Sequence, residues 1–91
     1  MQFTWDSEKD AANQRKHGVA FGDAMGVFGD PLARIHPDPE HSEGESRELI
    51  IGHATSGRLL LVCFTERSRI VRLFSAREAT NHERKDYEEN A

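Results

Sequence analysis

Three apolar runs in the second half of the chain predict β-strands. They extend from Arg47 to Gly52, from Arg58 to Thr65 and from Ile70 to Phe74, and short polar segments separate them. Such spacing is typical of an antiparallel meander. The middle run is apolar on both faces, so we expect it to be the central strand, covered by helices on at least one side. Leu32 to His36 is a candidate for a fourth strand.

A mostly polar segment near the N-terminus predicts a surface helix. Phe3 to Trp5 alternates like a short strand, and Asp6 can then cap a helix from Ser7 to His17. Gly18 suits the left-handed residue that ends a helix. Basic side chains gather in the last turn, where they complement the negative end of the helix dipole. This effect alone is a sufficient reason for the cations that precede Gly18.

Two further helices are predicted, one apolar and one polar. The first has four apolar side chains at helical spacing, and we expect it to lie in the core: Phe21, Ala24, Met25 and Phe28. In the second, Ser75 and Glu78 match the capping-box pattern S-x-x-E, which predicts a helix from Ser75 to about Asn90. The whole pattern predicts a single α+β domain that spans residues 1–91. We expect a small antiparallel β-sheet meander with two N-terminal helices and one C-terminal helix.

The composition is that of a small globular domain. The 91 residues are 36% hydrophobic and 31% charged, which suits a single core. No apolar run approaches the roughly 18 residues that cross a bilayer, and the N-terminus is charged where a signal peptide is apolar. We therefore expect a cytoplasmic protein with no membrane partner. Cys63 is the single cysteine, which excludes an internal disulfide and argues against a zinc site; we expect a buried thiol in a strand.

The cations are unevenly distributed along the chain. The net charge is −4, yet residues 58–77 contain five arginines and one acidic residue, Glu66. Nine of the twelve cations in the whole chain are arginine, whose planar guanidinium binds phosphate and carboxylate through paired hydrogen bonds. The composition therefore suits either RNA or an acidic protein partner, and does not choose between them.

Several charged side chains are candidates for one binding groove. One cation is enough to complement the helix dipole, so the dipole does not explain His17. Imidazole is the usual general acid or base near neutral pH. Arg67 lies at the predicted turn between two core strands, and Arg77 and Arg84 are seven residues apart near the C-terminus. If these segments share one side of the molecule, Lys16 joins them in a groove that suits a phosphodiester. The simpler alternative is an ordinary surface whose arginines pair with neighbouring carboxylates.

Metal-free cleavage of RNA fits this set of residues. RNA supplies its own nucleophile, the 2′-OH, so the protein needs only a base, an acid and cations. The candidate bases are His17, Glu66 and Glu83, the candidate acids are Lys16, His17 and Tyr87, and the candidate cations are Arg67, Arg77 and Arg84. The sequence supplies these groups without assigning a role to each.

Other chemistries lack their motifs. The chain contains no G-x-G-x-x-G, P-loop or G-x-S-x-G pattern, so we expect no nucleotide cofactor and no acyl transfer. His36, His41 and His53 lie in loop or strand-end settings near acidic residues, but no helical i, i+4 pair or H-E-x-x-H pattern supports a metal site. A metal enzyme built on these histidines is the least favoured hypothesis.

Five motifs, in order along nearly the whole chain, resemble those of the BrnT toxin family. They are W-D followed by N-x2-K-H-G-V-x-F within Phe3 to Phe21, F-x-D-P at Phe28 to Pro31, E-x-R at Glu45 to Arg47, T-E-R at Thr65 to Arg67, and S-A-R-x-A-x3-E-R-x2-Y at Ser75 to Tyr87. None is diagnostic alone, but coincidence does not produce five in the right order and at the right distances.

The resemblance implies a RelE-like fold and a ribonuclease toxin that blocks translation. It also implies an antitoxin, BrnA, with a dimerising ribbon-helix-helix domain, so that a two-plus-two complex represses its own operon and the toxin meets DNA only through the antitoxin. The site residues that the motifs carry over are Lys16, His17, Arg67, Arg77, Glu83, Arg84 and Tyr87. After Ala79 this chain is less basic than many relatives, which predicts weaker binding of RNA.

Two functional classes remain open at this point. The leading hypothesis is a metal-independent endoribonuclease that a protein partner silences by covering its groove. The alternative is a non-catalytic interaction module, in which the arginines bind an acidic partner and His17 only caps a helix.

Overall fold

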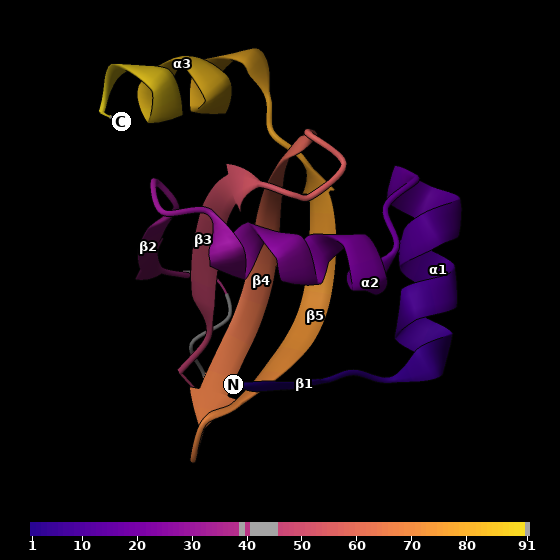
Figure 1. Ribbon diagram of the computed structural model, residues 1–91. Helices are drawn as coiled ribbons and strands as arrows, with labels where there is room; N and C mark the ends of the chain where they lie inside the picture. Colours follow the sequence, from indigo (N-terminus) through magenta and orange to yellow (C-terminus); the bar gives the residue numbers. More distant parts are fainter. Residues whose placement is uncertain (39, 41–45, 91) are drawn as a thin grey trace.

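Five strands form one sheet, and a short helical segment crosses one of its faces (Figure 1). The computed structural model describes residues 1–38, 40 and 46–90. Its elements in chain order are β1 (Gln2–Thr4), α1 (Ser7–His17), α2 (Phe21–Ala24), the 3-10 helix η1 (Met25–Gly29), β2 (Arg34–Pro37), β3 (Glu48–His53), β4 (Leu59–Arg67), β5 (Ile70–Glu78) and α3 (Asn81–Glu89). Within the described ranges no helix is long and apolar enough to cross a membrane.

The strand order is β1-β5-β4-β3-β2. The strands β3, β4 and β5 form the predicted antiparallel meander, β4 is central, and the candidate fourth strand is present as β2. The prediction of a purely antiparallel sheet is wrong, because β1 pairs in parallel with β5, with Phe3 opposite Val71. Parallel neighbours need a long connection, and the whole chain between β1 and β5 provides one.

The core lies between the sheet and the segment formed by α2 and η1. Leu60, Val62 and Phe64 alternate along β4 toward this side and are almost fully buried, as are Phe21 and Val27 from the helical segment. Helices thus cover one face of the central strand, as expected. Intervening β4 residues point to the opposite face, which α2 and η1 leave uncovered and which α3 contacts only at one end, through Tyr87 against Leu59.

The second helix differs from the single regular helix that the apolar spacing predicts. One α-helical turn ends at Ala24 and a 3-10 helix continues to Gly29. At Gly26 a Cβ atom would lie 2.7 Å from Oγ1 of Thr55 and 2.8 Å from its backbone nitrogen, so only glycine lets this segment approach the loop after β3 so closely. The predicted face still packs inward, with Phe28 edge-to-face against Phe64 at 5.0 Å between ring centroids.

The last helix begins later than predicted. Ser75 to Glu78 belongs to β5, where Glu78 pairs with Leu60, because the β4 ladder continues to that point. The capping box is formed instead by Thr80 and Glu83: the Glu83 amide donates to Thr80 Oγ1 at 3.1 Å, and the Thr80 amide donates to Glu83 Oε1 at 2.9 Å. The prediction of a capping box at Ser75 is therefore wrong, and the strand takes precedence over a four-residue pattern.

The first helix has the predicted ends. Asp6 accepts hydrogen bonds from the amides of Glu8 and Lys9, and Gly18 adopts a left-handed φ of 69° while its amide donates to the Gln14 carbonyl. The helix lies beside β5 at one edge of the sheet (Figure 1). Its C-terminal end, with His17, consequently lies next to the end of β5.

Candidate active site

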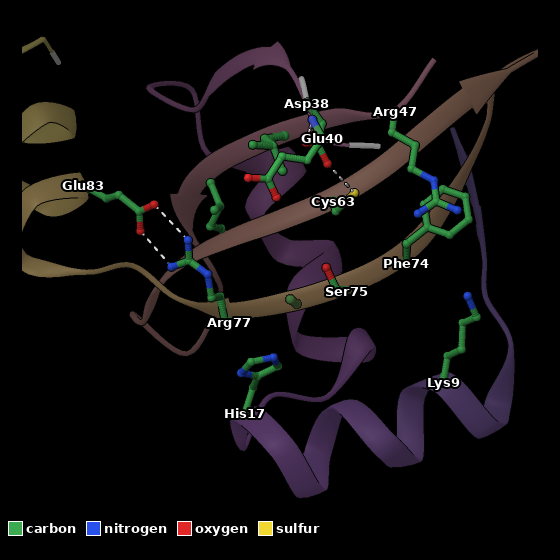
Figure 2. A pocket seen from close by; sticks show the side chains of 13 residues that line it. Lys9, His17, Asp38, Glu40, Arg47, Cys63, Phe74, Ser75, Arg77 and Glu83 are labelled. Atoms are coloured by element: carbon green, nitrogen blue, oxygen red, sulfur yellow. Dashed lines mark hydrogen bonds and ion pairs between the residues drawn. The ribbon is translucent and has the colours of Figure 1, made fainter. Parts of the chain in front are cut away.

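A pocket of about 560 Å³ lies on the uncovered face of the sheet (Figure 2). Its floor is apolar and consists of Leu49, Leu61 and Cys63 from β3 and β4. The α1 helix borders one side through Lys9 and His17. An apolar floor with charged groups around it is the usual composition of a small-ligand or active site.

One end of the pocket holds a paired arginine and carboxylate next to a histidine. Arg77 of β5 donates two hydrogen bonds to Glu83 of α3, at 2.8 and 2.9 Å, and His17 faces the same space (Figure 2). The hydrogen bonds from Arg77 hold the pKa of Glu83 near 2, against a smaller opposing effect of burial, and the same contact raises the pKa of Arg77. The pair is therefore fully charged at neutral pH.

A buried asparagine holds the end of α1 against the sheet. Asn13 is 6% exposed; its Nδ2 donates to the carbonyls of Val19 and Ala76, both at 2.8 Å, and its Oδ1 accepts from the Ala76 amide at 3.1 Å. The β1 strand pairs with β5 only as far as Arg72, so at Ala76 the asparagine side chain takes the place of a neighbouring strand. This contact fixes His17 close to Arg77.

The middle of the pocket contains a buried thiol and a buried carboxylate. The Cys63 Sγ donates to Asp38 Oδ2 at 3.5 Å, and both residues are less than 10% exposed. Burial, reinforced by the Asp38 carboxylate, raises the pKa of Cys63 to about 11. The thiol is thus protonated at neutral pH and is no nucleophile, in agreement with the predicted buried cysteine in a strand.

The other end of the pocket is built around an aromatic ring. The guanidinium carbon of Arg47 lies 3.9 Å from the centroid of the Phe74 ring, and the Lys9 ammonium lies 5.7 Å from the same centroid. Figure 2 shows these three side chains together, away from Arg77 and Glu83. Cations at these distances are attracted to the negative face of the ring.

Comparison with known proteins agrees with this architecture. Residues 5–83 match the family described as "Ribonuclease toxin, BrnT, of type II toxin-antitoxin system". The chain belongs to the BrnT family. The crystal structure of the Brucella abortus ribonuclease toxin BrnT is similar, with a TM-score of 0.69 and 25% sequence identity over 89% of this chain and 99% of that one. No curated protein matches the chain significantly. This protein is therefore a ribonuclease toxin of a type II toxin-antitoxin system by family.

The pocket of this BrnT protein collects only part of the predicted groove. Of the five cations expected to converge, His17 and Arg77 line it. Lys16 is exposed one residue before His17, and Arg84 is exposed one residue after Glu83; neither lines the pocket. Arg67 is opposite Ile70, about 23 Å along β5 from Arg77 at the ordinary rise of a strand. The prediction of a single groove is therefore wrong for Arg67. Arg67 lies at the tip of the β4–β5 hairpin and Arg77 near its base, so most of the length of the hairpin separates them.

Tyr87 lies outside the pocket and anchors α3 in this BrnT chain. It is 4% exposed, packs against Ile51 and Leu59, and donates to Asp30 Oδ2 at 2.6 Å. Burial, together with the Asp30 carboxylate, raises the pKa of Tyr87 to about 12. The pKa of Asp30 is lowered, because burial is outweighed by hydrogen bonds from the His53 amide, Tyr87 and the Leu32 amide. A tyrosine held in this way does not reach a substrate in the pocket.

Several pocket residues were not predicted as site residues from the sequence, among them Lys9, Asp38, Glu40, Arg47 and Phe74. The E-x-R motif contains Arg47 and was the one available indication, but it does not show that the residue faces Phe74. The metal hypothesis gains no support from the described residues, among which no group of three or more potential ligands is arranged for a metal. His53 contacts Asp30 and Tyr87, and His41 lies outside the described residues.

The Arg77–Glu83 pair predicts a specific pH dependence of stability. The pKa of Glu83 is near 2 in the folded protein, against an ordinary value of 4.5, so the pair stabilises the fold above about pH 4.5 and loses this contribution as the pH falls toward 2. Glu83→Gln keeps the cap but removes the charge, so we expect it to be less stable than the original protein at neutral pH. We expect the difference in unfolding free energy between the two proteins to shrink as the pH falls below about 4.5. Urea unfolding of both proteins between pH 7 and pH 3 measures it; a deficit that stays constant with pH would contradict the assigned charge.

Proposed function

We propose that this protein cleaves RNA without a metal ion, using the 2′-OH of the substrate as the nucleophile. The observation that carries the proposal is that His17 of α1 and Arg77 of β5, far apart in the sequence, line one pocket. The 2′ oxygen forms a bond to phosphorus and the bond to the 5′ oxygen breaks, which leaves a 2′,3′-cyclic phosphate and a 5′-OH. Such a reaction needs proton transfer and stabilisation of negative charge, and these two groups supply them.

Within the pocket the roles follow from the contacts. Arg77 presents its guanidinium to the non-bridging oxygens of the phosphate, where charge increases in the transition state. Glu83 is a positioning residue, since its two hydrogen bonds fix the orientation of that guanidinium. His17 lines the pocket and has no hydrogen-bond or ion-pair partner within the part of the chain that the structure describes, so its imidazole is available to take the proton of the 2′-OH. The departing 5′ oxygen receives a proton from the resulting imidazolium or from water.

This assignment narrows the catalytic set carried over from the family resemblance. His17, Arg77 and Glu83 remain in it. Lys16, Arg67 and Arg84 are outside the pocket and are left to contribute at most to the long-range attraction of RNA. Tyr87 is removed from proton transfer and retained as the residue that holds α3.

The proposal includes the biological setting that the family implies. A ribonuclease toxin acts in the cytoplasm on the RNA that supports translation, and a BrnA-like antitoxin with a ribbon-helix-helix domain neutralises it in a two-plus-two complex that binds DNA. Membership in a type II toxin-antitoxin family supports the existence of an antitoxin partner. Because the pocket lies on the uncovered face of the sheet, a partner can close it without rearrangement of the core.

The test compares an all-ribose oligonucleotide with one that carries a single 2′-deoxy position at the cleavage site, both in excess chelator. We expect cleavage of the first, with a 2′,3′-cyclic phosphate end, and none of the second at that position. Cleavage of the 2′-deoxy position, or a strict requirement for added metal, would contradict the proposal.

One observation favours the non-catalytic alternative. The described part of the pocket holds three acidic side chains, Asp38, Glu40 and Glu83, opposite Lys9, Arg47 and Arg77, and Arg77 is already paired. In an interaction module these charges would bind a protein partner of mixed charge. That function predicts no cleavage of either oligonucleotide in the same assay.

A further inference from the structure

The β5 strand contains one extra residue at the end of the pocket farthest from Arg77. Ser75 pairs with Cys63 and Leu73 pairs with Phe64, so Phe74 has no partner in the ladder and forms a β-bulge. A bulge redirects a side chain, and here it turns Phe74 onto the uncovered face, beside Ser75, where it lines the pocket. A large aromatic side chain in an open pocket breaks the usual pattern of a half-buried strand, and such departures concentrate at functional sites.

Two cations from separate parts of the chain meet at this ring. Arg47 precedes β3 and Lys9 lies on α1, yet both lie within 6 Å of the Phe74 centroid. Their approach places two positively charged groups beside one aromatic surface. Proteins bind single-stranded RNA through this combination, in which a base stacks on an aromatic ring or a guanidinium plane and cations hold the backbone.

The ring lies at a useful distance from the proposed reaction centre. Phe74 precedes Arg77 by three residues, about 10 Å along β5 at the ordinary rise of a strand. The residues between them, Ser75 and Ala76, are small, and the floor beneath is apolar at Leu61. A chain whose phosphate binds at Arg77 can therefore place an adjacent base over this floor and against the Phe74 and Arg47 pair (Figure 2).

We infer that Phe74 and Arg47 form a nucleobase-stacking subsite next to the scissile phosphate. The inference rests on the proposed function for the identity of the ligand, and it adds that the substrate is recognised as an unpaired nucleotide through the face of its base. Stacking is available to every base, so the subsite selects single strands over duplexes and depends little on the base sequence.

The test measures binding in the absence of cleavage. A short fluorescent 2′-O-methyl oligoadenylate has no free 2′-OH and stays intact, so its dissociation constant is obtained at equilibrium for the original protein, Phe74→Leu and Phe74→Trp. We expect Phe74→Leu to weaken binding by about 5- to 150-fold, the usual effect of losing one stacked base. Phe74→Trp, which keeps an aromatic plane, is expected to bind at least as tightly as the original protein. Thermal unfolding of each variant shows that the fold is retained.

An abasic 2′-O-methyl oligomer of equal length is the matched probe. Because it has a backbone but no bases, its affinity is expected to be the same for the original protein and Phe74→Leu. Equal affinity of both proteins for oligoadenylate, or an equal loss for the two probes, would overturn the inference. Phe74-dependent binding by a protein that cleaves no all-ribose RNA would support the subsite while contradicting the proposed catalysis.

Discussion

Replacing His17 by alanine is expected to lower the single-turnover rate of RNA cleavage by about 10²- to 10⁴-fold, the usual contribution of a positioned general acid or base. His17 is the imidazole that lines the described pocket, beside Arg77. Since the side chain is partly exposed and has no hydrogen-bond partner among the described residues, its loss removes little from the fold. The thermal unfolding temperature should therefore change little while the rate falls.

Lys16→Ala is the matched control for this variant. Lys16 is the preceding residue of the same helix, is exposed and does not line the pocket, so removing it tests charge without removing the proposed proton carrier. We expect a much smaller loss of rate, which increased salt diminishes. If Lys16→Ala abolished cleavage and His17→Ala did not, the proton-transfer role would belong elsewhere.

Replacing Asn13 is expected to produce a large loss of stability. The Asn13 amide satisfies the Ala76 amide, the Ala76 carbonyl and the Val19 carbonyl in a buried setting. Three buried backbone groups left without partners cost about 1–3 kcal/mol each, so Asn13→Ala should lower the free energy of unfolding by at least about 3 kcal/mol. Urea unfolding at neutral pH measures this difference.

The nearly isosteric Asn13→Asp provides a sharper version of the same test. A carboxylate cannot donate to the two carbonyls and places negative charge beside them, so it should destabilise the protein at neutral pH at least as much as alanine. RNA cleavage should fall in both variants, because α1 carries His17. A stability close to that of the original protein in both variants would show that the asparagine does not hold the helix.

The sequence predicts most of the fold because the relevant patterns are local. The apolar runs give β3, β4 and β5, and the Asp6 and Gly18 signals give both ends of α1. The parallel pairing of β1 was missed, since its partner is nearly seventy residues away and no local pattern records it. The start of α3 was missed for a related reason: strand pairing across a hairpin decided whether Ser75 to Glu78 is extended.

The sequence predicted which types of residue form the candidate site, but not which of the named residues lie together in the folded protein. The motifs named His17, Arg77 and Glu83, which do lie together, and equally named Arg67 and Arg84, which lie elsewhere. Tyr87 shows why: an aromatic hydroxyl three residues after Arg84 resembles a catalytic acid until its hydrogen bond to Asp30 is known. Asn13 has no charge and no catalytic group, so the sequence does not mark it as a site residue. Its role in placing His17 is seen only in its hydrogen bonds to the backbone of Ala76 at the edge of β5.

The central claim is that RNA is cleaved in the pocket at the base of the β4–β5 hairpin rather than at its tip. The most direct test is the single-turnover cleavage rate of Arg77→Ala compared with that of Arg67→Ala, since both remove one arginine from the same hairpin. We predict a loss of about 10²- to 10³-fold for Arg77→Ala, as for other groups that stabilise transition-state charge, and a small, salt-sensitive loss for Arg67→Ala. A large loss for Arg67→Ala with little effect of Arg77→Ala would place the reaction at the tip and contradict the account.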